Sequence, residues 1–190
     1  MADDHQNIVE RWFGDAFSQL HPQLQMLHRQ GGSLSGPISV SLGRGLGGMI
    51  GRRLAQRLGI PWQARNNHLA VNIFADAAGL RWNRRFNDDS EFRSTFVPVG
   101  HWPDGYWVEQ SGALQLRLRV NLRDGAWHWQ TIAARWRSVQ LPLWLFPRTL
   151  AYKEARGGQY HFHVSLSLPL LGLLLSYAGD LEANPVSRKD

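Results

Sequence analysis

The chain has 190 residues, with nine tryptophans, no cysteine and a formal net charge of +6 from 21 basic and 15 acidic residues. This length and an apolar content of 43% suffice for one folded domain and exclude wholesale disorder. The lack of cysteine excludes disulfides, thiolate catalysis and cysteine-ligated metals, and it fits a reducing cytoplasm.

The first 60 residues are predicted to form a helical N-terminal segment. Apolar residues recur at intervals of three and four over residues 8–29, and Pro22 predicts a kink or a break into two helices. Residues 30–37 are rich in turn-forming residues, and a second helix is expected over residues 46–58. The acidic, polar start of the chain does not resemble a signal peptide.

Residues 61–182 are predicted to form an antiparallel β region. Apolar and polar residues alternate over residues 114–122 and 160–168, and Asp124-Gly125 is a strong hairpin signal. Nine short strands with tight connections favour a strongly curved antiparallel sheet or a closed barrel. We therefore expect a single α+β domain, similar to calycins and lipocalins, with the N-terminal helices capping the barrel and residues 183–190 as a flexible tail.

The basic residues are almost all arginines scattered along the predicted strands, which is typical of solvated outer faces. A nucleic-acid groove is not favoured, because no recognisable binding motif accompanies the charge. Weak attraction to an anionic membrane surface fits the arginine and tryptophan content equally well. The longest apolar stretch, residues 166–175, falls short of the ~20 residues that span a bilayer, so we expect a soluble, cytoplasmic protein.

Two motifs suggest cofactors that their context does not support. The segment from Gly43 to Gly48 satisfies the G-x-G-x-x-G pattern, follows the strand-like residues 38–42 and precedes a helix. However, no acid follows about 20 residues later and no βαβ pattern surrounds it. His161 and His163 share one strand face, but a metal needs a third ligand, and His101 and His128 would have to be brought near by the fold. We expect neither a bound cofactor nor a metal.

An arginine on an otherwise apolar strand face is the most informative polar feature. Arg84 shares its face with Trp82 and Phe86, and burying it requires a partner, for which Glu109 is the candidate. The pair is either a structural ion pair inside the barrel or the polar anchor of a ligand pocket. The sequence alone leaves both interpretations open.

The chain also resembles a bacterial family of domains of unknown function, number 4166, from about Phe13 to Leu181. The resemblance rests on an ordered set of motifs: Gly14-Asp15-Ala16-Phe17, Gly43-Arg44-Gly45, Leu58-Gly59-Ile60-Pro61, Trp82-Asn83-Arg84-Arg85-Phe86, Ser94, Glu109, Gly112, Leu141-Pro142, Phe162-His163-Val164, Pro169, Tyr177 and Gly179. Relatives occur alone or fused behind an NAD(P)-binding reductase-like domain, so the resemblance implies a stand-alone copy. His163 departs from the family's usual residues, which counts against a metal role for the histidine pair.

The leading functional hypothesis is binding of a hydrophobic small molecule, such as a lipid or polyketide-like metabolite, in a barrel cavity. The candidate ligand-binding residues are Trp82, Arg84, Ser94, Glu109, Phe162 and Tyr177. One alternative is an isomerase, cyclase or hydrolase-like enzyme on the same cavity, with Glu109 as general base and Arg84 stabilising negative charge. Another is an accessory domain that docks to a separate reductase or to a membrane through Arg52, Arg53 and Arg57.

Overall fold

The computed structural model describes residues 7–76, 79–87 and 91–186. In chain order these residues form α1 (Ile8–Phe13), the 3-10 helix η1 (Gly14–Gln19), α2 (Pro22–Gln30), β1 (Gly32–Leu42), α3 (Gly45–Arg57), β2 (Asn67–Asp76), β3 (Gly79–Phe86), β4 (Phe92–Val99), β5 (Tyr106–Ser111), β6 (Leu114–Arg123), β7 (Ala126–Trp136), β8 (Val139–Leu141), β9 (Arg148–Arg156), β10 (Gln159–Leu168) and β11 (Gly172–Pro185).

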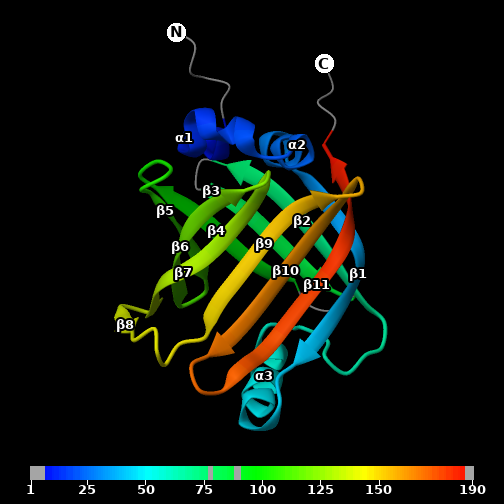
Figure 1. Cartoon of the computed structure of the whole chain (residues 1–190), viewed down its shortest axis with the longest axis vertical. Coiled ribbons are helices and arrows are strands. Elements are labelled where there is room, and N and C mark those ends of the chain that lie inside the picture. The colour runs from blue at the N-terminus through cyan, green and yellow to red at the C-terminus, as the bar shows by residue number, and fades with distance from the viewer. Residues whose placement is uncertain (1–6, 77–78, 88–90, 187–190) are drawn as a thin grey trace.

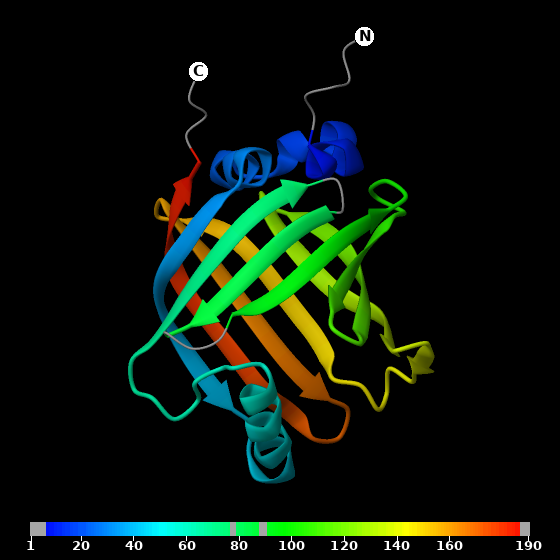
Figure 2. The ribbon, with the colours of Figure 1, turned by 180° about the vertical axis from the view of Figure 1, so that it is seen from behind.

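The sheet closes into an antiparallel barrel (Figures 1 and 2). Strands β1 to β6 pair in sequence order, β6 pairs with β7, and β7, β9, β10 and β11 lead back to β1. Ten strands form the wall, and the short β8 pairs with β7 at the margin. This confirms the predicted antiparallel barrel, although lipocalins close with eight strands.

Strand β1 begins within the predicted turn-rich residues 30–37 and continues through the strand-like residues 38–42. Its glycines suggested a loop, but they serve close pairing with β11. A Cβ atom on Gly36 would lie 2.7 Å from the carbonyl oxygen of Asp180, so only glycine fits this backbone approach. At the other end of the chain, β11 continues to Pro185, past the expected start of a tail, and residues 187–190 lie outside the described residues.

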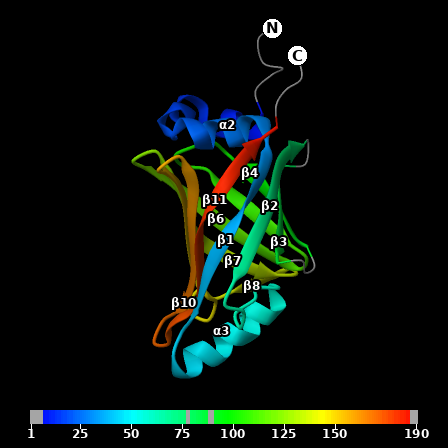
Figure 3. The ribbon, with the colours of Figure 1, turned by 90° about the vertical axis from the view of Figure 1, so that its right-hand side faces the viewer.

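The N-terminal helices cover one end of the barrel, as expected (Figure 3). The predicted 8–29 helix is divided first at Gly14, where the backbone φ of 56° ends α1. Asn7 caps α1 in a capping box, and its side-chain amide also donates to the carbonyl oxygens of His28 and Arg29 in α2. The helices insert buried apolar side chains into the barrel end: Val9, Trp12, Phe13, Phe17, Leu20, Leu24 and Leu27.

Helix α3 lies at the opposite end of the barrel (Figure 1), close to its predicted range. It packs directly on the backbone of β11 through small residues. A Cβ atom on Gly51 would lie 1.9 Å from the carbonyl oxygen of Leu174, and one on Gly43 would lie 1.8 Å from that of Leu173. Within the G-x-G-x-x-G segment, Gly43 and Gly47 therefore permit close contact with the start of β11.

Among the residues that the structure describes, no helix is long and apolar enough to cross a membrane.

Candidate functional site

The register of β3, β4 and β5 brings four polar side chains together on the inner wall of the barrel. Trp82 lies opposite Ser94, Arg84 lies opposite Phe92, and Phe96 lies opposite Glu109. Residues opposite each other in antiparallel strands share a face, so alternate residues of each strand meet on one surface. This surface carries Arg84, Ser94, Glu109 and Ser111.

These four residues form a hydrogen-bonded cluster. Arg84 Nη2 lies 3.2 Å from both Glu109 Oε1 and Ser94 Oγ, and the Ser94 hydroxyl lies 2.8 Å from the same carboxylate oxygen. Ser94 and Ser111 are joined at 2.9 Å. Glu109 Oε2 accepts no hydrogen bond from another described residue. The cluster therefore retains a free acceptor and further guanidinium N–H groups.

Aromatic rings surround this polar cluster. The Arg84 guanidinium lies 5.4 Å from the ring centroid of Phe92 and 5.8 Å from that of Trp82, which is cation–π distance. Tyr177 packs edge-on against Phe162 at 5.8 Å. Burial raises the pKa of the Tyr177 hydroxyl, and the neighbouring Arg84 guanidinium opposes that shift. The structure thus brings all six sequence-predicted residues to one interior region, with Ser111 added.

Trp82 also contacts a buried lysine, Lys153, which the sequence pattern did not indicate as a site residue. Lys153 is 2% exposed, and its Nζ lies 3.7 Å from the ring centroid of Trp127, 4.5 Å from that of Trp82 and 5.6 Å from that of Trp129. Its polar contact is with His28 of α2, at 2.7 Å from Nζ to Nε2. Burial lowers the pKa of Lys153 well below its usual range, because a charged amine is poorly solvated there.

Several polar atoms in the interior are buried without a hydrogen-bond partner among the described residues. Buried polar groups are nearly always paired, so each such atom suggests a missing partner. They are His28 Nδ1, Trp82 Nε1, Trp107 Nε1, Trp127 Nε1, Thr131 Oγ1 and Tyr160 Oη.

Inward-facing side chains differ in exposure between the two ends of the barrel. At the capped end Trp107 and Trp127 are fully buried beneath α1 and α2, where Trp12 lies 5.4 Å from Trp107 between ring centroids. Toward the α3 end Leu116, Val164 and other apolar side chains pack against the core yet remain partly exposed. The inner wall is therefore sealed at the cap, whereas toward α3 part of it reaches solvent and part, including Phe86 and Leu175, is buried.

The histidine pair lies outside the barrel. His161 Nδ1 is 2.7 Å from Asp180 Oδ1, and His163 stacks on Tyr152 at 5.6 Å between ring centroids. Burial and the nearby His161 lower the pKa of His163. His128 also stacks on Tyr152, at 5.5 Å between ring centroids. No group of residues suited to a metal ion occurs within residues 7–76, 79–87 and 91–186.

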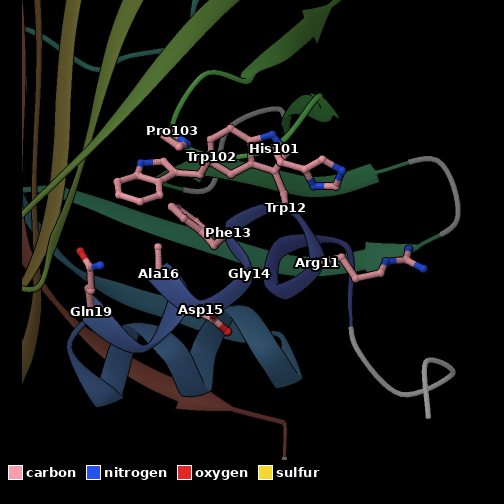
Figure 4. A pocket seen from close by; sticks show the side chains of 10 residues that line it. All are labelled: Arg11, Trp12, Phe13, Gly14, Asp15, Ala16, Gln19, His101, Trp102 and Pro103. Carbon is pink, nitrogen blue, oxygen red and sulfur yellow. The ribbon is translucent and has the colours of Figure 1, made fainter.

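A surface pocket of about 480 Å³ lies outside the barrel, where α1 and η1 meet the loop between β4 and β5 (Figure 4). Its lining includes Arg11, Asp15, His101 and Trp102, none of which belongs to the interior cluster. Because the pocket is wide open and its charged groups make no convergent cluster, the interior remains the stronger candidate site.

Comparison with known proteins places the chain in one family. No curated protein matches the sequence. The family model described as a domain of unknown function, DUF4166, matches residues 20–181, which include every strand except the last four residues of β11, the Arg84 cluster, Lys153 and His28. The resemblance drawn from the sequence motifs is thus confirmed, and the chain belongs to the DUF4166 family.

Proposed function

We propose that the protein binds a hydrophobic small molecule inside the barrel, with the polar end of the molecule held by Arg84 beside its partner Glu109. The observation that carries this proposal is the partial exposure of that ion pair. Each side chain is 16% exposed although both face the interior of a closed barrel. A purely structural interior pair would be sealed from solvent, whereas this one is partly exposed to it, which supports a role in binding.

The surroundings of the pair suit an amphipathic ligand. Apolar inner-wall side chains extend from the cluster toward the α3 end and remain partly exposed, among them Leu116, Val164 and Leu166. Ligand pockets generally combine an apolar lining with a few convergent polar groups. A fatty acid or a similar metabolite with one oxygenated end matches this distribution.

The experiment that tests this proposal is a fluorescence titration with cis-parinaric acid, a fluorescent fatty acid. The Arg84→Ala variant should bind it at least about tenfold more weakly, which corresponds to the loss of one charge-assisted hydrogen bond. Arg85→Ala is the matched control, because Arg85 is the next residue on β3 and is exposed. Equal affinity in both variants, with native circular dichroism, would remove Arg84 from the binding site.

A second candidate function, docking to an anionic membrane surface, is favoured by the composition of the α3 end. Residues 43–66 contain five arginines, residues 135–148 contain three, and neither segment contains an acid. All eight arginines are exposed. Large exposed apolar side chains occur in the same region: Leu46, Met49, Trp136, Val139, Trp144, Leu145 and Leu170. Arginines interspersed with tryptophan and leucine are typical of surfaces that contact anionic lipid.

Co-sedimentation with vesicles tests this docking. The protein should sediment with phosphatidylcholine–phosphatidylglycerol vesicles and much less with phosphatidylcholine alone. Replacing Arg52, Arg53 and Arg57 with glutamate should release it. The matched control replaces three exposed arginines nearer the capped end with glutamate, which gives the same change in net charge: Arg11, Arg119 and Arg123. Equal release by both triple variants would show only a general charge effect.

A further inference from the structure

We propose that Lys153 is a covalent attachment site for hydrophobic aldehydes or ketones, which it captures as an imine inside the barrel. This inference rests on the proposed function, since the carbonyl compound must enter the interior. It goes beyond that function by naming the reactive group and the chemical class of the ligand.

The position of Lys153 is unusual for a lysine. Buried ammonium groups are normally paired with carboxylates, because an isolated buried charge is costly. Within the described residues Lys153 forms no ion pair, and its hydrogen-bond partner is the imidazole of His28, itself 1% exposed. A methionine would fill the same space among the tryptophan rings without a polar atom to satisfy.

The surroundings of Lys153 favour the neutral, nucleophilic form of the amine. Three tryptophan rings exclude water from Nζ, and burial lowers the pKa of Lys153. The pKa of His28 is also lowered, by burial first and by the nearby Lys153 second. A desolvated lysine in an apolar pocket is the usual arrangement for imine formation with carbonyl compounds.

Unpaired donors beside the amine provide a second, independent indication of a ligand. The Nε1 atoms of Trp82 and Trp127 are buried without a partner, although both rings contact Lys153 Nζ. His28 Nδ1 is also unpaired, and it carries the ring proton whenever Nε2 accepts from the lysine. An oxygen-bearing ligand would supply the acceptor that these N–H groups lack.

The reaction needs no reagent beyond the amine and the carbonyl compound. The nitrogen lone pair of Lys153 attacks the carbonyl carbon and forms a C–N bond, while the C=O π electrons move to oxygen. His28 Nε2, at 2.7 Å from Nζ, can take a proton from nitrogen and return it to oxygen. The carbinolamine then loses its hydroxyl as water, a second N–H proton leaves with it, and the C=N bond forms. No oxidation or reduction occurs, and hydrolysis reverses the process.

Trp82 connects this amine to the accessible part of the interior. Lys153 Nζ and Arg84 Cζ lie 4.5 Å and 5.8 Å from the centroid of the same ring. Trp82 is itself partly exposed, and the four-carbon stem of lysine is flexible. A ligand that reaches Arg84 is thus separated from the amine by one aromatic side chain.

Reductive trapping tests the inference, and the sequence makes the test selective. The chain has two lysines, Lys153 and Lys189. The wild-type protein is incubated with cinnamaldehyde or decanal and sodium cyanoborohydride, and the adduct is located by peptide mass spectrometry. We expect a stable adduct on Lys153 in the wild type and in the control variant Lys189→Arg. The adduct should be absent from that position in Lys153→Arg, which keeps hydrogen-bond donors but cannot form an imine.

Binding without reaction is measured in parallel, by quenching of tryptophan fluorescence with cinnamyl alcohol and decanol. Quenching by the alcohols together with a missing Lys153 adduct would overturn the covalent inference and leave the proposed binding function intact. A lack of both quenching and adduct would overturn the two together. An adduct confined to Lys189 or the α-amino group would likewise refute capture at Lys153. Lys153→Met provides a second variant in which alcohol binding should persist.

Discussion

Replacing Lys153 with methionine should make the stability of the protein less dependent on pH. The folded-state pKa of Lys153 lies well below its usual 10.5 because of burial, whereas the unfolded chain keeps the ordinary value. Between these two pKa values the unfolded state binds one proton more than the folded state. The free energy of unfolding of the wild type therefore rises with pH in this window and falls as the pH decreases.

The magnitude follows from the proton count. One proton contributes about 1.4 kcal/mol per pH unit, so stability should rise by up to about 2 kcal/mol between about pH 7.5 and pH 9. Keeping the amine neutral at a pH below its usual pKa costs free energy, and methionine removes this cost. Methionine also leaves His28 Nε2 without a partner, at about 1–3 kcal/mol whatever the pH. We therefore expect the stability of Lys153→Met relative to the wild type to be higher at about pH 7.5 than at about pH 9, by up to about 2 kcal/mol.

Urea unfolding followed by circular dichroism at several pH values measures this effect. The stability of Lys153→Met relative to the wild type should fall as the pH rises. Starting near pH 7.5 keeps His28 out of the measurement, because its unfolded pKa is near 6.5. Arg156→Met is the control, since it removes an exposed cation of the same strand and should run parallel to the wild type. A difference that stays constant for Lys153→Met would show that the buried lysine remains protonated and would refute the reasoning.

Three further predictions concern the cluster, the close helix contact and the cap. Glu109→Gln should tighten binding of cis-parinaric acid by about tenfold, because the Arg84 guanidinium loses its competing carboxylate; weaker binding would assign Glu109 a direct role in holding the ligand. Gly51→Ala should destabilise the protein by about 2–4 kcal/mol in urea unfolding, because its methyl group would overlap the Leu174 carbonyl, whereas Gln56→Ala on the exposed face of α3 should change little. Asn7→Ala removes the α1 capping box and the contacts to α2 and should cost about 1–2 kcal/mol, and an unchanged unfolding midpoint would contradict this role.

The sequence predicted the barrel where alternation was clear, as in β6 and β10. It could not predict closure, because closure depends on pairs far apart in the chain, such as Ile38 with Gly179. The first half of β1 was missed because the Gly-Ser-Pro composition of residues 32–37 is also typical of loops, whereas residues 38–42 were recognised as strand-like. In the folded protein those glycines allow the backbone of β11 to approach β1 closely. This requirement comes from a distant part of the chain and leaves no pattern in the local sequence.

The candidate site was predictable only where a polar residue interrupted an apolar face. Arg84 stood between Trp82 and Phe86, so its face and its need for a partner could be inferred. Lys153 offered no such contrast, because its neighbours Tyr152 and Glu154 are polar as well and lie on the opposite face. The alanines at positions 151 and 155 were the available indication that this face points inward.

The two ends of the barrel differ in a way that joins the separate proposals. The cap helices fill one end with aromatic side chains, whereas the inner wall toward α3 stays partly exposed and is bordered by arginines and exposed apolar residues. A ligand that leaves a membrane at this end would meet Arg84 first and reach Lys153 beyond Trp82. On this arrangement the cap has two roles, because α2 both closes the barrel and supplies His28 to the amine. Loosening the cap should therefore impair imine formation at Lys153 more than reversible binding at Arg84. The Asn7→Ala variant tests this: its yield of the trapped Lys153 adduct should fall more than its affinity for the alcohols, which fluorescence quenching measures.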